Sequence, residues 1–140
     1  MIKMMNGLLG DFVVAAHKVQ GLHWYVKGPD FFMAHAKLEE IYDELQLMVD
    51  ETAEVMLMCE MKPVATMGEF ASHAQLEEAK LDFTTSKDAF AIVAKDYAAL
   101  IENVGDVKAK AESEHLDLIA LKCDTFHETL AKTHWMLTQR

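Results

Sequence analysis

The chain has 140 residues, of which 51% are hydrophobic and 26% charged, with only two prolines and six glycines. This length suits one domain, residues 1–140, and is too short for two domains with cores of their own. The formal net charge of -10 disfavours DNA and anionic lipid as partners and suits the collection of cations. A composition dominated by good helix formers predicts an all-α fold.

The first helix is predicted from about Asn6 to Lys27, because apolar side chains recur there at helical spacing. The stripe consists of Met5, Leu8, Leu9, Phe12, Ala16, Val19 and His23. Gly28-Pro29 ends this helix, since proline disfavours helical geometry in the residue before it. Asp30 follows as an N-cap whose side chain is expected to accept hydrogen bonds from the first free amides of the next helix.

Three further long helices are expected along the chain. The second runs from about Asp30 to Met61 and is followed by a short helical piece between about Gly68 and Leu76. The third begins near Ser86 and continues through Gly105, where its apolar stripe keeps its phase. The fourth carries Leu116, Ile119, Cys123, Phe126, Leu130 and Leu137 at nearly heptad spacing. This order predicts a four-helix bundle with a long crossover between the second and third helices.

The chain is expected to be cytoplasmic. Its N-terminal apolar stretch contains Asp11, which the apolar core of a secretion signal would exclude. No apolar run reaches membrane-spanning length. Cys59 and Cys123 have no metal-ligand spacing, so we interpret them as buried thiols in a reducing compartment and expect no disulfide.

The second predicted helix carries two pairs of candidate metal ligands. His35 and Glu39 are four residues apart, and so are Asp50 and Glu54, so each pair shares a helix face. One imidazole with three carboxylates suits iron or manganese. Asp50 lies 15 residues after His35, roughly 22 Å along a helix. The two pairs therefore cannot hold one ion within a single chain.

The two pairs are nevertheless symmetric. His35 precedes the point between residues 44 and 45 by as much as Glu54 follows it, and the same holds for Glu39 and Asp50. If two copies of this helix pack antiparallel about a two-fold axis at that point, each His35-Glu39 pair faces an Asp50-Glu54 pair. One such contact generates two identical sites.

Simpler interpretations exist for each of these residues. Two i,i+4 pairs on a glutamate-rich helix arise often as solvated faces, and His73 and Glu77 repeat the same spacing. His23 lies on the buried stripe of the first helix, where a histidine is usually a hydrogen-bonded core residue. It also lies close in the chain to the helix that carries His35, which favours a shared site.

These segments resemble the Dps family, the DNA-protection-during-starvation proteins or mini-ferritins. The similar stretches are residues 22–35 (LHWYVKGPDFFMAH), 42–45 (YDEL), 49–54 (VDETAE) and 132–137 (KTHWML). The resemblance is strong over residues 15–60 and weaker but collinear elsewhere. It implies a ferritin-like four-helix bundle with a short extra helix in the long connection.

The resemblance also implies a site and an activity. His23, His35 and Glu39 would come from one subunit and Asp50 and Glu54 from its two-fold mate, binding iron (Fe²⁺/Fe³⁺). The activity would be that of a ferroxidase, with hydrogen peroxide preferred over oxygen, followed by mineral storage in a hollow dodecamer and protection against oxidative stress. Trp24 matches an aromatic that takes up oxidising equivalents, and it is equally compatible with a place in the bundle core.

The sequence departs from the family pattern in three places. The family more often has aspartate where this chain has Glu39. DNA-binding relatives carry a lysine-rich N-terminal tail, whereas only Lys3 precedes the predicted first helix, so DNA binding is not expected. Many members begin the fourth helix with a Gly-Asp-x-x-Thr pattern that lines iron-uptake pores. This chain has His115-Leu116-Asp117 there, and its candidate substitutes are Glu112, Glu114 and Asp117.

Two alternative functions remain. An ordinary di-iron protein with its site inside one bundle would need two Glu-x-x-His motifs, and the chain has only Glu112-Ser113-Glu114-His115. A cage or binding module without ferroxidase activity would keep the assembly and lose the oxidation of iron. Ferrous oxidation by the purified apo-protein separates these cases.

Overall fold

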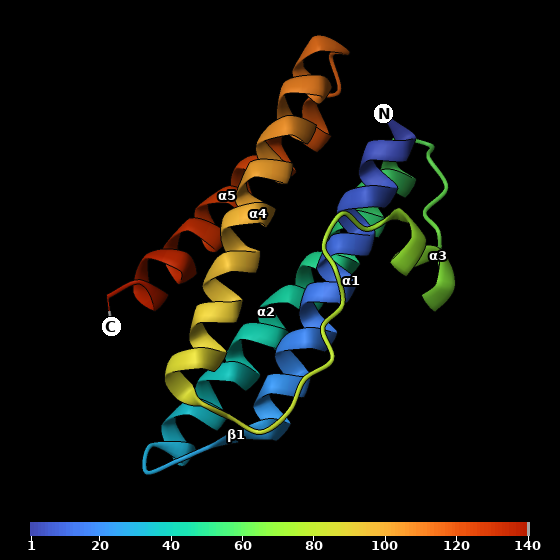
Figure 1. The fold of residues 1–140 in the computed structure, drawn as a ribbon. Helices are drawn as coiled ribbons and strands as arrows, with labels where there is room; N and C mark the ends of the chain where they lie inside the picture. Colours follow the sequence, from blue (N-terminus) through green and yellow to red (C-terminus); the bar gives the residue numbers. More distant parts are fainter. Residues whose placement is uncertain (140) are drawn as a thin grey trace.

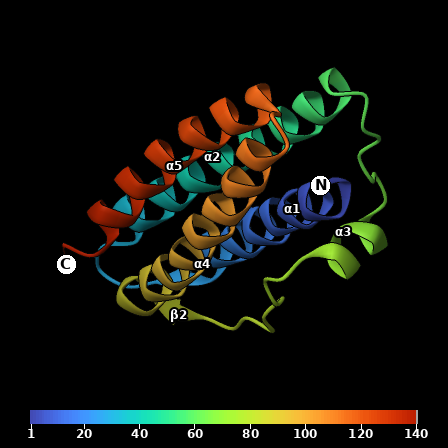
Figure 2. The same ribbon diagram turned by 90° about the horizontal axis from the view of Figure 1, so that it is seen from above.

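Four long helices form a bundle in the computed structural model, which describes residues 1–139. The helices α1 and α2 form one antiparallel pair, and α4 and α5 form the other, with α1 against α4 and α2 against α5 (Figures 1 and 2). The predicted all-α, four-helix architecture with a short extra helix is confirmed. The helices are α1 (Ile2–Tyr25), α2 (Phe31–Met58), α3 (Met67–His73), α4 (Ser86–Ser113) and α5 (Asp117–Leu137).

The core lies between the four long helices, because each presents an apolar stripe inward. Phe12 of α1 meets Phe126 of α5 edge-on, with ring centroids 5.3 Å apart. Tyr97 of α4 is fully buried in the same core. Gly105 lies within α4, as predicted, and interrupts neither the helix nor its buried stripe.

The ends of the helices differ from the sequence-based boundaries by a few residues. The first helix begins at Ile2 and ends at Tyr25, because Val26–Lys27 forms a short strand, β1. This strand pairs in parallel with β2 (Thr84–Thr85), so that the end of α1 is joined to the start of α4. The second helix ends at Met58, three residues earlier than predicted.

The crossover between α2 and α4 runs along the outside of α1 (Figure 1), and two buried polar side chains of α1 hold it there. Asp11 accepts hydrogen bonds from the backbone N–H groups of Gln75 and Leu76, at 2.6 and 2.9 Å. Asn6 accepts one from the N–H of Val64 at 3.0 Å. Burial raises the pKa of the Asp11 carboxyl despite these donors. The residue that argues against a secretion signal is therefore a structural anchor.

Two helices end in a left-handed residue that is not glycine. Glu60 after α2 and His115 after α4 both have φ near 60°. In each case the next N–H bonds back to a carbonyl five residues earlier, as Leu116 N–H does to Ala111 at 2.8 Å. This is the geometry of a Schellman motif, in which glycine is the usual residue.

Both cysteines are free, with Cys123 buried in α5 and Cys59 half-buried after α2. Burial raises the pKa of the Cys123 thiol to about 12. Among the described residues, no helix is both long enough and apolar enough to cross a bilayer.

The crossover's close approach to α1 gives a stability prediction. A Cβ added at Gly10 would overlap the carbonyl oxygen of Phe70 and lie 3.1 Å from the amide nitrogen of Ala74. Gly10→Ala should therefore lower the free energy of unfolding by about 1–3 kcal/mol. Gly105→Ala is the matched control, because nothing lies within 4 Å of its Cβ. It should raise stability by about 0.5–1 kcal/mol through helix propensity. Urea unfolding measures both, and equal effects of the two substitutions would contradict the close approach.

Candidate metal centre

His23 and His35 are tied to each other by two hydrogen bonds. The Nδ1 of His23 lies 2.7 Å from the carbonyl oxygen of His35, and the Nδ1 of His35 lies 2.8 Å from the carbonyl oxygen of His23. Their rings are stacked, with centroids 3.6 Å apart and planes 15° from parallel. The last turn of α1 and the first turns of α2 are thereby locked side by side, although 12 residues separate the two histidines.

These hydrogen bonds determine which nitrogen of each imidazole ring carries a proton. A carbonyl oxygen can only accept, so each Nδ1 must carry the proton and donate it. In a neutral ring the other nitrogen, Nε2, then keeps a free lone pair, which is the form in which histidine binds metals. Two nitrogen donors are thus prepared in one place by the backbone alone.

The turn between the helices has the residues needed to bring the rings together. Gly28 has a φ of 134°, which favours glycine over any residue with a side chain. Asp30 occupies the N-cap position of α2, as predicted, but its side chain makes no capping bond. Its Oδ2 accepts from Ser86 Oγ at 2.5 Å. The predicted capping role is therefore wrong: the carboxylate links this turn to the start of α4.

Glu39 lies one turn beyond His35 on the exposed face of α2. Its Oε1 accepts a hydrogen bond from the hydroxyl of Tyr42 at 3.3 Å. The Tyr42 ring also meets His23 edge-on, with centroids 5.3 Å apart, and Phe31 stacks on His35 at 4.8 Å. Two nitrogen donors therefore lie among aromatic rings at the α1–α2 corner, and Tyr42 connects them to the carboxylate of Glu39.

Asp50 and Glu54 are not part of this group in the single chain. Both are exposed on α2, toward its other end. Consistent with their distance, the described residues contain no group of three or more His, Cys, Asp or Glu side chains able to hold a metal ion within one chain. One chain brings the rings of His23 and His35 together, Tyr42 connects this pair to Glu39, and Asp50 and Glu54 remain apart from them.

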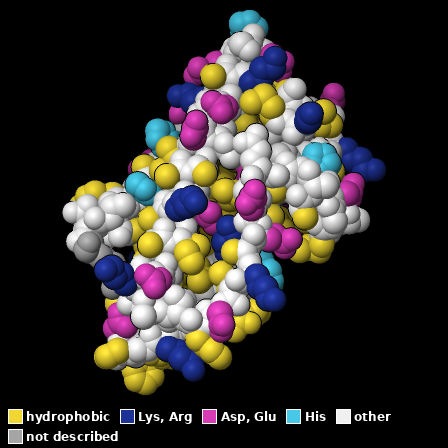
Figure 3. Space-filling view, in the orientation of Figure 1, with side chains coloured by type: hydrophobic (Ala, Val, Ile, Leu, Met, Phe, Trp, Pro, Cys, Tyr) yellow, Lys and Arg dark blue, Asp and Glu magenta, His cyan; other side chains and the backbone are white. Residues whose placement is uncertain are grey.

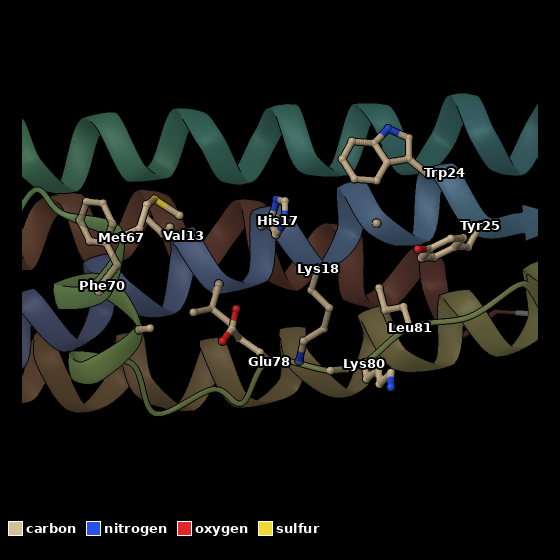
Figure 4. A pocket seen from close by; sticks show the side chains of 15 residues that line it. Val13, His17, Lys18, Trp24, Tyr25, Met67, Phe70, Glu78, Lys80 and Leu81 are labelled. Atoms are coloured by element: carbon tan, nitrogen blue, oxygen red, sulfur yellow. The ribbon is translucent and has the colours of Figure 1, made fainter.

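Trp24 is 57% exposed, so its interpretation as bundle core is wrong. It lies at the edge of a cavity of about 610 Å³ between α1 and the crossover. Figure 4 shows Trp24 and Tyr25 at one end of this cavity and Phe70 and Met67 at the other. His17 approaches Trp24 edge-on, with centroids 6.2 Å apart.

The structure does not support a di-iron site inside one bundle. The acid between α2, α4 and α5 is Glu44, which accepts hydrogen bonds from Tyr97 at 2.7 Å and from Thr133 at 3.1 Å. Among the described residues no hydrogen bond joins a histidine to Glu44, and the Glu112–His115 motif lies at the exposed end of α4. Glu44 is a hydrogen-bond acceptor that joins three helices.

Sequence reasoning did not assign functions to Tyr42 and Phe31, the aromatic neighbours of the histidines. A signal for Tyr42 was available, because residues three apart on a helix can touch and Tyr42 follows Glu39 by three. The stacking of Phe31 on His35 had no comparable signal, since it depends on how the turn at Gly28 enters α2.

Comparison with known proteins agrees with this architecture. The family model for the ferritin-like domain matches residues 2–139. The chain therefore belongs to the ferritin-like family.

Within that family it is a member of the Dps proteins. It is 34% identical to DNA protection during starvation protein 2 of Bacillus anthracis, over 97% of this chain and 92% of the relative. The crystal structure of Dps from Staphylococcus aureus has a TM-score of 0.91 at 28% identity, covering 97% of this chain and 91% of the other. Dps from Vibrio cholerae, described as a member of a broad superfamily of ferritin-like diiron-carboxylate proteins, has a TM-score of 0.92 at 27% identity. It covers 97% of this chain and 85% of the other.

The position of Glu44 gives a prediction about pH. Burial raises the pKa of its carboxyl above the usual value of 4.5, even though Tyr97 and Thr133 donate to it. Within the window from 4.5 up to the raised pKa, the folded state binds more protons than the unfolded state, so stability falls as pH rises. Glu44→Gln removes this titration.

We expect the stability of the native protein, relative to Glu44→Gln, to decline as pH increases from 4.5 to the raised pKa of Glu44. Urea unfolding at one fixed protein concentration measures it, since assembly also affects stability. Asp11 is present in both proteins and its contribution cancels. A difference that stays constant or grows with pH would contradict the burial of an ionisable Glu44.

Proposed function

We propose that this protein is an iron-oxidising and iron-storing mini-ferritin whose ferroxidase sites are each shared by two subunits. The observation that carries the proposal is the paired histidine arrangement. The backbone carbonyls of His23 and His35 each accept a hydrogen bond from the other residue's Nδ1, both Nε2 atoms are left for a metal, and Tyr42 connects the pair to the carboxylate of Glu39. Three donors from one chain leave an ion with open positions, which the acids of a second chain can fill.

The exposed face of α2 supports the two-fold pairing of subunits. Eight residues form a stripe along this face. They follow one another at alternating spacings of four and three residues, which is the pattern of helices that pack along their length. All but Ala53 are exposed, and Ala53 is half-buried. The positions are Phe32, Ala36, Glu39, Asp43, Gln46, Asp50, Ala53 and Leu57.

This stripe is symmetric about the point between residues 44 and 45. In an antiparallel pair, Phe32 faces Leu57 of the partner subunit, and Ala36 faces Ala53 of the partner subunit. Phe32 is 89% exposed and Leu57 60% exposed in one chain, and covering both would remove apolar surface from water. The ends of the stripe are thus suited to self-association.

The centre of the stripe requires a cation. In the same antiparallel pair Glu39 faces Asp50 of the partner subunit, and Glu54 of the partner subunit falls beside His35. Facing carboxylates repel each other when an interface excludes water. Packed helices lie about 8–10 Å apart, so acids from both sides can reach one ion between them. Iron bound there replaces repulsion with attraction.

The ligand set suits iron as the substrate. Imidazole nitrogen and carboxylate oxygen are ligands for Fe²⁺, and the carboxylates favour the ferric product because they compensate its extra charge. Two Fe²⁺ ions each give one electron to one hydrogen peroxide, which takes up two protons and becomes two waters. This paired transfer consumes peroxide without releasing a hydroxyl radical. Trp24 is exposed near His23 and supplies an oxidisable side chain if only one electron is delivered.

We further propose that the subunits assemble into a hollow dodecamer in which ferric mineral is deposited, as part of the response to oxidative stress. The acidic composition, with 23 acidic against 13 basic residues, suits the attraction of Fe²⁺. Glu112, Glu114 and Asp117 are exposed at the turn from α4 to α5 and remain our candidates for iron uptake. Two free thiols suit the reducing cytoplasm.

The shared site is tested by complementation. Subunits with His35→Ala and subunits with Asp50→Ala should each be inactive as a ferroxidase. When the two are co-expressed with different tags and purified as mixed particles, each mixed dimer regains one intact site of two. Random mixing then restores about one quarter of the native activity. The rate of Fe²⁺ oxidation with peroxide measures this.

The matched control mixes His35→Ala with Glu39→Ala. Both substitutions lie on the same side of the proposed site, so no mixed dimer contains an intact site and no activity should return. Equal recovery of ferroxidase activity in the two mixtures would overturn the shared site. So would the absence of activity from both mixtures, once mass measurements have verified that the particles are mixed. Native apo-protein that assembles without oxidising Fe²⁺ would instead favour the cage without ferroxidase activity.

DNA binding is not part of the proposed function, although the Bacillus anthracis relative is named for DNA protection. Lys3 lies within the first turn of α1. On the face seen in Figure 3, Lys side chains are interspersed with Asp and Glu. With a net charge of -10, we expect no gel shift of duplex DNA at physiological salt, because phosphate binding needs a concentrated positive surface. A shift that disappears at higher salt would show that this expectation is wrong.

A further inference from the structure

Tyr42 contacts two of the three candidate ligands that one chain would contribute to the proposed site. Its hydroxyl donates to Glu39 Oε1 at 3.3 Å, and its ring meets the His23 ring edge-on at a centroid distance of 5.3 Å, with planes 73° apart. The ring is half-buried, with His23 on one side. Tyr42 therefore has a fixed position from which to hold the carboxylate of Glu39.

Glu39 needs such a contact more than an aspartate would. A glutamate side chain has one more rotatable bond, and its freedom must be lost when the carboxylate binds an ion. Glu39 is also exposed on the surface of α2. Among the described residues, the phenol of Tyr42 is the group that hydrogen-bonds to the Glu39 side chain.

We propose that Tyr42 is a positioning residue that holds the Glu39 carboxylate ready for the metal, and that it thereby compensates for a glutamate at a position where an aspartate would be held closer to its helix. This inference rests on the proposed function, because it concerns the same site. Tyr42 acts through Glu39 and takes no part as a ligand. Its contribution is one hydrogen bond to a ligand oxygen, of the kind that orients metal ligands.

The test combines Tyr42→Phe with Glu39→Asp and uses Co²⁺ as the probe, because its visible absorption reports coordination. In the native background, Tyr42→Phe should raise the Co²⁺ dissociation constant about three- to tenfold, the effect of one hydrogen bond. It should raise the KM for Fe²⁺ and leave kcat nearly unchanged, since the lost interaction acts on binding.

In the Glu39→Asp background the carboxylate is shorter by one carbon–carbon bond, about 1.5 Å. Removing the phenol hydroxyl should then change the dissociation constant by less than about twofold. A purely structural role for Tyr42 would cost the same in both backgrounds. The difference between the two effects is therefore the result that supports positioning.

Tyr97→Phe is the matched control. It also removes a hydrogen bond from a tyrosine to a glutamate, at 2.7 Å to Glu44, but inside the bundle and away from the candidate ligands. It should lower the Tm and leave the Co²⁺ dissociation constant unchanged.

His35→Ala separates failure of this inference from failure of the proposed function. If it abolishes Co²⁺ binding while Tyr42→Phe has no effect, or the same effect in both Glu39 and Asp backgrounds, the positioning role is overturned and the site stands. If His35→Ala leaves Co²⁺ binding intact, the site itself is overturned, and the role of Tyr42 with it.

Discussion

The two hydrogen bonds between the rings and backbones of His23 and His35 are the interaction on which the arrangement of this corner depends. Each ring nitrogen satisfies a carbonyl oxygen of the other residue, at 2.7 and 2.8 Å. The bonds therefore join two helices, bury one imidazole without leaving its Nδ1 unpaired, and set the tautomer of both rings. The same two hydrogen bonds therefore hold the two helices together and leave both Nε2 atoms available to bind a metal.

The sequence predicts the helices more completely than it predicts the three-dimensional arrangement of the candidate site. Apolar periodicity in α1, α4 and α5 is long enough to identify each helix, and Gly105 is correctly kept inside α4 because the stripe keeps its phase. The parallel pairing of Val26–Lys27 with Thr84–Thr85 leaves no such pattern, since two residues are too few to show an alternation. Asp30 fails as a capping side chain for a related reason. Its partner, Ser86, is 56 residues away, and local rules for helix starts do not include it.

For the site, the sequence indicates which residue types belong together and the symmetry that relates them. The spacing of His35, Glu39, Asp50 and Glu54 on one helix is enough to exclude a site within one chain. Sequence spacing does not reveal that His23 and His35 stack, or that Trp24 is exposed. Those facts depend on the angle at which the Gly28 turn joins the helices, and that angle results from packing and from the positive φ of one glycine.

The proposed site also links iron binding to assembly. The exposed stripe of α2 has Phe32 and Leu57 at its ends and acids at its centre, so in the proposed antiparallel pair two copies would attract each other at the ends and repel each other in the middle. An ion bound at the centre removes the repulsion only when both copies are present. A ligand that binds only the assembled state stabilises that state by mass action, and the coupling is reciprocal. Each subunit contact then raises the affinity for iron, and each iron bound strengthens the contact. Under the proposed function, the incompleteness of the site in one chain would restrict ferrous oxidation to assembled subunits, where the proposed cage would receive the product.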